Sequence, residues 1–544
     1  MLTSRTNSPS WLIVTLLIAV PIALPIIVLI GAALAPGGDS WVHTRDTVLG
    51  LYFGNTVLLM VLVALIALSI GVTAAWLTAQ YEFPLRRLLI PALALPLAAP
   101  AYVIGYVYAD LLEFAGPVQT LLRQWLDLPN NTALLPNVRS LPGASLVMAL
   151  VLYPYIYLLA RGSFVQQSGA LHEAARALGA SRLTVFWRVG LPVARPALMG
   201  GLALVLMETV ADYGVVEHYG VPTLTTGIFR TWFAMGEPAA ALQLAGWLFI
   251  LVCMLIVAEQ FARRGQRFNP LSRQLQVVRP RLAGWQGWTA CGLCLMPVLL
   301  GLVLPLLALL ALALRVGLTP LNSMVLTLIG NSILVSSIAT VICAAAAVWL
   351  AYAERLYPQP LLRGGVRVAT MGYAVPGLVL AVALMLPMTS LDKWIATQLR
   401  DVFDIRWGLL LTGTPAALIF VYVARFLTPA FNSTQAGLMQ IHPQFDAAAR
   451  SLGQSPGSVL RRVHLPLLRP AILTGLLLVF IDVMKELPAT LILRPFNFET
   501  LATWVYRYAS DERLAEASTA ALIIVLVSLL PTCLLTVSRR DDHS

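Results

Sequence analysis

Two pairs of carboxylates interrupt the apolar stretches of this 544-residue chain. Glu208 and Asp212 lie four positions apart, and Asp482 and Glu486 repeat that spacing 274 positions later. Residues four apart share one face of a helix, so each pair is predicted to present two acids to one side of an apolar helix. Carboxylate oxygens suit hard, highly charged cations. The spacing therefore predicts a polar path for a cation, binding it weakly enough to release it.

The same acids have a structural interpretation. Lys485 lies directly before Glu486 and three positions after Asp482, so the carboxylates can instead neutralise this lysine and neighbouring backbone groups. The acid pairs recur at matching positions in both halves, which favours a role in a cation path over this structural role. A third alternative is a secondary carrier or channel that uses the acids as a proton or cation relay without any ATP-hydrolysing partner.

No cluster of cysteine and histidine competes with the acids as a metal site. Cys291 and Cys294 have redox-motif spacing but lie in an apolar run, where packing is the expected role. We expect His172 and His464 to be solvated loop residues. The sequence therefore predicts no tightly bound cofactor and no catalytic residue.

The elements that carry the acids must lie in a membrane. Hydrophobic residues make up 59% of the chain and charged residues 11%, with a mean hydropathy of +0.81. Twelve apolar runs reach the roughly 20 residues that a membrane-spanning helix needs. They lie near 11–36, 52–78, 88–112, 141–164, 197–217, 239–262, 287–314, 326–353, 366–390, 408–430, 471–491 and 518–538.

The predicted fold is all-α and polytopic, with about twelve transmembrane helices in two parallel six-helix repeats. An even number of spans puts both termini on one side, and most lysines and arginines fall in segments that are cytoplasmic if the N-terminus is. The net charge of +11 thus mainly reflects the enrichment of basic residues in cytoplasmic loops. Nucleic-acid binding is the weaker interpretation, because the basic residues are spread over several short loops and do not form a single stripe.

A tandem duplication of the sequence explains why two similar six-helix repeats are predicted. The polar stretch with Ala174, Ala175, Gly179 and Leu191-Pro192 recurs 274 positions later with Ala448, Ala449, Gly453 and Leu465-Pro466. Weaker matches extend it, including Gly54-Asn55-Thr56 with Gly330-Asn331-Ser332 and Pro100 with Pro376. We predict a first repeat at 1–262, a cytoplasmic linker at 263–283 and a second repeat at 284–544.

The repeated polar stretch carries a family resemblance. Glu173-Ala174-Ala175, followed by Gly179 and Leu191-Pro192, resembles the EAA loop of permease subunits in binding-protein-dependent ABC importers. The resemblance implies a short helix that docks in a groove of a cytoplasmic ATPase. An ordinary interfacial helix without a partner is the alternative, and a second copy of the motif argues against it.

The second copy of the loop departs from the pattern. Ala447 stands where Glu173 stands, and the acid comes one residue earlier, as Asp446. One residue turns a helix by about 100°. We therefore expect Asp446, Ala448, Ala449 and Gly453 to belong to a docking loop without assigning the contact of Glu173 to Asp446.

The ATPase must be a separate subunit. The chain has two lysines, Lys393 and Lys485, and neither follows a glycine, so it contains no GxxxxGK[ST] phosphate-binding loop. The chain is accordingly predicted to be no enzyme, and ATP is predicted to be used by a partner.

The cargo is indicated by a narrower resemblance. The tract from Asp482 through Lys485 and Glu486 to Thr490 is similar to fused two-repeat permeases of bacterial iron(III) ABC importers, and the tract around Glu208 and Asp212 resembles them too. This implies a type I importer fold in the bacterial inner membrane, two copies of a cytoplasmic ATPase, and Fe3+ delivered by a periplasmic or lipid-anchored binding protein. The metal-coordinating role of the acids is our inference from their pairing.

Other cargoes remain open within the same machinery. Thiamine, a polyamine or an oxyanion are alternatives, although four carboxylates argue on electrostatic grounds against an anion. On the outer face, Arg230 and Arg507 lie in matching segments and are predicted to contact acids of the binding protein. Contact with solvent or lipid headgroups is the alternative for both arginines.

Overall fold

The computed structural model describes residues 9–35, 38–167, 178–263, 279–317, 323–404 and 408–541. Ten helices within these ranges are long and apolar enough to cross a membrane, and a bent helix pair raises that number to eleven. The last helix adds a shorter apolar segment, Leu514–Leu529. Each of the twelve predicted runs overlaps a helix or a pair of helices, which confirms the polytopic all-α fold.

The helices follow one another in the same order in both halves. The first half contains α1 (Pro9–Leu34), α2 (Asp39–Thr44), α3 (Gly50–Gln80), α4 (Arg86–Ala92), α5 (Ala101–Leu112), α6 (Pro117–Trp125), α7 (Leu141–Gln166), α9 (Arg182–Val185), α10 (Leu191–Ala211), α11 (Gly214–His218), α12 (Leu224–Phe229) and α13 (Pro238–Arg263). The second half contains α14 (Trp285–Val298), α15 (Leu304–Arg315), α16 (Ser323–Leu356), α17 (Pro360–Ala369), α18 (Gly377–Phe403), α19 (Ala416–Gln440), α20 (Gln444–Ser451), α21 (Pro456–Val459), α22 (Leu465–Met484), α23 (Pro488–Leu493), α24 (Leu501–Ser510) and α25 (Leu514–Asp541).

Two matched prolines break runs that were predicted to be single spans. Pro100 precedes α5, and the helical segments Arg86–Ala98 and Ala101–Trp125 meet at an angle of 91°. Pro376 separates α17 from α18 in the same way. A proline cannot donate a backbone hydrogen bond and pushes the preceding residue into an extended conformation, as at Ala99 and Val375.

The described residues form two compact units, and each contains helices from both halves of the sequence. One unit draws on Met1–Trp41, Thr231–Phe249 and Leu321–Trp504, and the other on Val42–Arg230, Ile250–Pro320 and Val505–Ser544. We call them the α19 unit and the α7 unit, after their central helices. The predicted boundaries at 263–283 concern the duplicated sequence and stay a prediction, since residues 264–278 lie outside the described ranges.

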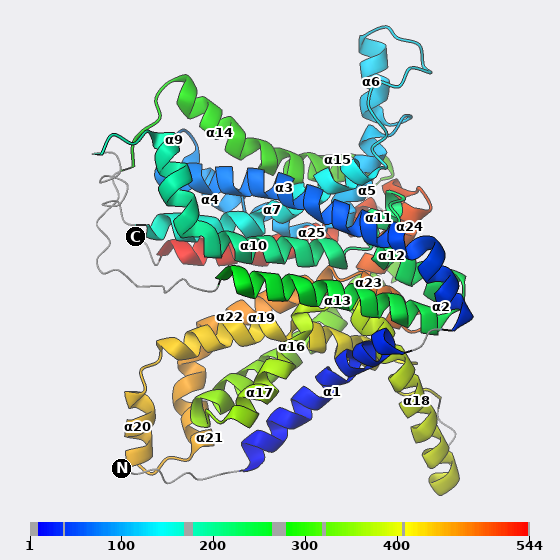
Figure 1. Cartoon of the computed structure of the whole chain (residues 1–544), viewed down its shortest axis with the longest axis vertical. Coiled ribbons are helices and arrows are strands. Elements are labelled where there is room, and N and C mark those ends of the chain that lie inside the picture. The colour runs from blue at the N-terminus through cyan, green and yellow to red at the C-terminus, as the bar shows by residue number, and fades with distance from the viewer. Residues whose placement is uncertain are drawn as a thin grey trace. The chain divides into compact units, whose positions relative to one another are not determined.

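In the α7 unit, helices α3, α7 and α10 lie side by side (Figure 1). In the α19 unit, α19 packs against α16 and α22 in the matching arrangement. Glycines permit the close approach: a Cβ atom on Gly201 would lie 2.8 Å from Cα of Ile156, and one on Gly475 would lie 3.2 Å from Cα of Ala430. These two contacts occupy corresponding positions of the repeats, so the duplication extends to the packing of the cores.

The first helix of each half packs in the unit built around the other half. Helix α1 contacts α17 and α18, and Trp11 stacks on Trp349 with ring centroids 4.1 Å apart. Helices α14 and α15 contact helices of the first half, and the hydroxyl of Tyr108 donates to the carbonyl of Leu300 at 2.6 Å. The two halves therefore exchange their first spans.

A matched hydrogen bond confirms the register of the repeat. The amide nitrogen Nδ2 of Asn55 donates to the carbonyl oxygen of Pro222 at 2.9 Å. In the second half, Nδ2 of Asn331 donates to the carbonyl oxygen of Glu499 at 3.0 Å. Both bonds tie the start of a long helix to the loop that precedes α12 or α24. The short Gly-Asn motif recognised in the sequence is thus a structural element of each repeat.

Candidate functional site

The paired acids do not share a helix. Helix α10 ends one residue before Asp212, and α22 ends two residues before Glu486, so only Glu208 and Asp482 lie on the long helices. The prediction that each pair occupies one face of a continuous helix is wrong. Proline at 488 and glycine at 214 follow closely, and both residue types disfavour continuation of a helix.

The second acid of each pair accepts a hydrogen bond from the first turn of the next short helix. Oδ1 of Asp212 accepts a hydrogen bond from the backbone N–H of Val215 at 2.9 Å, at the start of α11. Oε1 of Glu486 accepts one from the backbone N–H of Ala489 at 3.3 Å, at the start of α23. A carboxylate is stabilised by the unpaired N–H groups of a helix N-terminus. Asp212 and Glu486 therefore occupy the same position relative to the following helix in both repeats, although neither shares a helix with the first acid of its pair.

In the second half, both acids are engaged by cations. Nη1 of Arg425 lies 2.7 Å from Oε1 of Glu486, and the two side chains are 9% and 2% exposed. Nζ of Lys485 lies 3.0 Å from Oδ1 of Asp482 in a more accessible position. A Cβ atom on Gly377 would overlap Oε1 of Glu486 and Nη1 of Arg425, so the buried pair needs glycine beside it. These contacts favour the interpretation that Asp482 and Glu486 neutralise neighbouring cations and stabilise the fold.

Sequence reasoning missed Arg425. The signal was available, because a single arginine inside the apolar run 408–430 is expensive unless an acid neutralises it. When the halves are aligned on Pro154 and Pro429, the first half has Leu150 at the matching position. The cation is consequently a feature of the second half alone, and the two carboxylate pairs have different electrostatic surroundings.

Among the described residues, no salt bridge like those of the second half is found for the carboxylates of the first half. Glu208 is half-buried on α10, and Asp212 is half-buried directly after it. Among the residues that the structure describes, no three or more His, Cys, Asp and Glu side chains gather in a group that could hold a metal ion. The roles of Glu208, Asp212, Asp482 and Glu486 along a path therefore remain predictions.

Only the second copy of the predicted docking loop can be followed in full. Glu173, Ala174 and Ala175 lie outside the described residues, as does His172. Gly179 and Gly453 are described, and both have left-handed backbones, with φ of +83° and +73°. Such angles are costly for residues with a Cβ atom, which explains glycine at both loops.

The second loop forms α20, with Ala448 exposed and Ala449 buried against the protein. The backbone N–H of Gln454 donates to the carbonyl of Ala449 at 3.1 Å, which closes the helix around Gly453. Leu452 is 77% exposed, and Leu178 of the first loop is 89% exposed. Two matched leucines therefore present apolar surface at the loops.

Asp446 points into the protein. Its Oδ2 accepts hydrogen bonds from Nε and Nη2 of Arg355 at 2.9 and 2.7 Å, and its Oδ1 lies 2.6 Å from Nε2 of His464. Burial alone would raise the pKa of the Asp446 carboxyl, but the hydrogen bonds from Arg355 and His464 outweigh it and hold that pKa below its ordinary value. Asp446 thus anchors α20 to α16 and to the turn before α22.

The prediction for His464 was wrong. Its side chain is 0% exposed and forms part of this anchor instead of a solvated loop. The sequence signal was weak, because an aspartate 18 positions earlier shows no helical or strand spacing to the histidine. The one-residue shift of the acid between the two loops now has a physical reason: at 446 the acid is used inside the protein.

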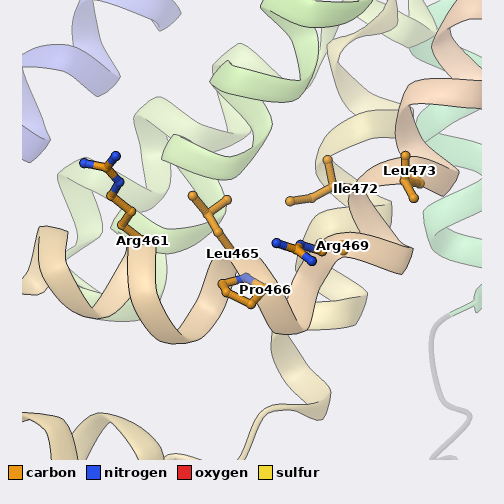
Figure 2. Close-up of a pocket in the computed structure, with 6 residues that line it drawn as sticks. All are labelled: Arg461, Leu465, Pro466, Arg469, Ile472 and Leu473. Carbon is orange, nitrogen blue, oxygen red and sulfur yellow. The ribbon is translucent and has the colours of Figure 1, made fainter.

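An open hollow follows this loop at the start of α22. Arg461, Leu465 and Arg469 extend from the same side of the helix (Figure 2). Pro466, Ile472 and Leu473 complete its lining. Arginines that flank an apolar strip can cover it with their methylene groups while the guanidinium groups reach water. The hollow thus marks the transition from the polar loop to the apolar helix.

The two arginines predicted to face a binding protein are both exposed. Arg230 directly follows α12, and Arg507 lies in α24. Helix α12 begins with a capping box in which the hydroxyl of Thr223 accepts from the N–H of Thr226. The cap fixes where α12 begins and hence where Arg230 leaves it.

Two segments of the chain, residues 67–264 and 344–540, match one family model, described as the inner membrane component of binding-protein-dependent transport systems. Together the segments cover well over half of the chain. The chain belongs to this family. The double match confirms the tandem duplication, and each matching segment contains one of the repeated polar loops.

Relatives of this permease differ in how much of it they match. The Fe(3+)-transport system permease protein FbpB 2 of Haemophilus influenzae is 29% identical over 544 residues, covering 97% of this chain and 98% of the relative. The sulfate transport system permease protein CysW of Escherichia coli is 34% identical over 167 residues, 30% of this chain and 55% of the relative. The molybdenum transport system permease protein ModB of Escherichia coli is 27% identical over 209 residues, 37% of this chain and 88% of the relative.

Membership in the family fixes the class of function. The permease is a multi-pass inner membrane protein, and it is a transport component and not an enzyme. Such permeases work with an ATPase subunit and a substrate-binding protein.

Proposed function

We propose that this permease carries ferric iron across the inner membrane into the cytoplasm. The observation that carries the proposal is the match to FbpB 2, which extends over nearly the whole of both chains. The matches to the sulfate and molybdenum permeases are confined to smaller parts of this chain. The carboxylates Glu208 and Asp212, for which the described part of the chain shows no salt bridge, also favour a cation.

An oxyanion is the second candidate, because CysW and ModB carry names of sulfate and molybdenum systems. Arg425 is the buried cation that an oxyanion would need. It lies against Glu486, however, and that carboxylate would repel an arriving anion. Thiamine and polyamines lack any specific observation in their favour.

The proposed mechanism uses ATP through partners. Two copies of a cytoplasmic ATPase dock on the two polar loops, with both termini of the permease also in the cytoplasm. ATP binding moves the loops together and opens the path outward, and ferric iron enters from a periplasmic or lipid-anchored binding protein. Within the path, Glu208 and Asp212 attract the cation, and Asp482 and Glu486 contribute only as far as Lys485 and Arg425 release them.

The cargo is tested with the complete transporter in proteoliposomes. Radiolabelled ferric citrate, with the binding protein added outside, is expected to accumulate only when ATP is supplied to the ATPase. Complexes with a hydrolysis-deficient ATPase are the control. Accumulation of sulfate or molybdate in place of iron would move the assignment to an oxyanion. Iron uptake by the permease alone, driven by an ion gradient, would favour the secondary carrier.

The outer arginines are the proposed contact with the binding protein. Reversing both charges in Arg230→Glu/Arg507→Glu should weaken electrostatic attraction to acids on that protein and lower binding-protein-stimulated ATP hydrolysis roughly tenfold. Arg315→Glu, another exposed arginine that the predicted topology puts outside, is the matched control. Unchanged stimulation in the double variant would assign both arginines to solvent or lipid headgroups.

A further inference from the structure

Tyrosines gather around Asp212 in the α7 unit. Tyr213 follows Asp212 directly and is 1% exposed. Its hydroxyl lies 3.1 Å from the hydroxyl of Tyr506, which comes from α24 near the end of the chain. Three segments that are far apart in sequence, α5, α10–α11 and α24, therefore contribute tyrosines to one region of the α7 unit.

The third phenol is that of Tyr106 on α5. Its side chain is 1% exposed, and its hydroxyl has no hydrogen-bond partner within the described part of the chain. This hydroxyl interacts electrostatically with Asp212, Glu217 and Tyr506. Buried hydroxyls in folded proteins nearly always have a partner, so a buried hydroxyl without one needs an explanation.

Phenol and carboxylate oxygens together form a set of hard donors. Hard, highly charged cations prefer oxygen ligands, and ferric ion is such a cation. When a phenol binds the ion, its O–H proton passes to water and the oxygen bonds to iron instead. The ring of His218 lies 4.6 Å from that of Tyr106 and closes one side of the cluster.

The positions of the second half that match the Asp212–Glu217 segment lack these features. At the positions that match Tyr213 and Glu217 the second half has Leu487 and Leu491. The acid that matches Asp212 is Glu486, which is held by Arg425. The cluster is consequently built on the Asp212–Glu217 segment of the first half with Tyr506 added from α24 of the second half, whereas the core packing around it is shared by both repeats.

We propose that Tyr106, Tyr213 and Tyr506, together with Asp212, form a transient binding station for ferric ion in the α7 unit. The proposal rests on the proposed function for its cargo. It also assigns a ligand role to the unsatisfied Tyr106 hydroxyl. Glu217, which is exposed, lies at the edge of the station and attracts the ion toward it.

The station is tested by visible absorption of the purified permease–ATPase complex titrated with ferric citrate. Coordination by a phenolate gives a phenolate-to-iron charge-transfer band, which citrate alone does not give. We expect the band in wild type and its loss, or a reduction of at least about half, in Tyr106→Phe. Because this hydroxyl has no partner to lose, the variant should fold normally.

Tyr108→Phe is the matched control, two positions along the same helix. The hydroxyl of Tyr108 is already bonded to the carbonyl of Leu300, so this variant should keep the full band. The absence of a band in wild type, or an equal band in wild type and Tyr106→Phe, would overturn the station.

Uptake in the proteoliposomes separates this proposal from the proposed function. Tyr106→Phe should lower ATP-driven ferric uptake about tenfold, the size expected when a group around a metal is removed, and Tyr108→Phe should not. Normal uptake in both variants would overturn the station and leave iron transport standing. No uptake in wild type would overturn the ferric assignment, and the absorption band would still decide whether the tyrosines bind the ion.

Discussion

Replacing Arg425 with methionine is expected to destabilise the permease by about 3–5 kcal/mol and to abolish transport. Methionine keeps much of the length of the side chain but removes the charge. Glu486, whose side chain is 2% exposed, would then be an uncompensated carboxylate in the interior of the α19 unit. The measurement is the thermal unfolding midpoint of the purified protein, together with ATP-driven uptake at matched membrane levels.

Lys485→Met is the matched control for this variant. It removes a cation from an ion pair in the same tract, but the side chains of Lys485 and Asp482 are 21% and 18% exposed, so water can solvate the remaining carboxylate better than it can solvate Glu486. We therefore expect a small change in its midpoint. A midpoint for Arg425→Met equal to that of wild type would refute a stabilising role for the pair.

The double variant Arg425→Met/Glu486→Met separates stability from transport. Apolar residues of similar size often replace a buried ion pair without loss of stability, so the midpoint should recover most of the way to wild type. If uptake recovers with it, the pair serves the fold. If the protein is stable but inactive, the charges themselves are needed during transport.

Replacing Asp446 with asparagine is expected to uncouple ATP hydrolysis from transport. Asparagine keeps the shape of the side chain but loses the charge that holds Arg355 and His464, so α20 should detach from α16 and the turn before α22. Two strong charge-assisted contacts are weakened at once. The readout is the number of ions imported per ATP hydrolysed, which should fall at least about tenfold if α20 no longer transmits motion.

The control for Asp446→Asn is Asp401→Asn, the same substitution in an exposed pair with Arg400. It should leave the ratio of transport to hydrolysis unchanged. A wild-type ratio in Asp446→Asn would show that the anchor of α20 is dispensable for coupling.

The anchor also predicts how coupling responds to acid. Because the pKa of Asp446 is lower in the folded protein than its ordinary value, its charge stabilises the anchor at pH values above that ordinary value, near 4. This contribution is lost as the pH falls through the lowered pKa. Wild type should therefore lose the α20 anchor only in strong acid, whereas Asp446→Asn should show no such transition. The measurement is the protection of the α20 backbone amides from hydrogen exchange as a function of pH, in wild type and in Asp446→Asn.

The sequence predicted the spans, the duplication and the polar loops because each depends on local composition or on a repeated motif. Two of its errors came from long-range contacts. Arg425 meets Glu486 across 61 positions, and Asp446 meets His464 from a different helix. A third error was local: proline and glycine after the paired acids end the helices, and this signal was present in the sequence but was outweighed by the apolar run.

The phenol cluster shows a further limit of prediction from sequence. Tyr106 and Tyr506 lie on two helices and Tyr213 lies in the break between α10 and α11, with no common spacing, and tyrosine is frequent enough in apolar segments to attract no notice. A search confined to acids, histidines and cysteines could not find them. Only the fold places Tyr506 of α24 beside Tyr213.

The exchange of first spans has a consequence for how the protein is made. Helix α1 leaves the ribosome first, yet the residues against which it packs, such as Trp349, are synthesised after more than half of the chain. During membrane insertion α1 must therefore wait in lipid or beside an insertion factor, without its final neighbours. The α7 unit cannot be complete before α25, the last helix to be made, has been inserted. Neither half is a self-sufficient folding unit, and a single continuous chain guarantees that both exchanging partners are present in equal amounts.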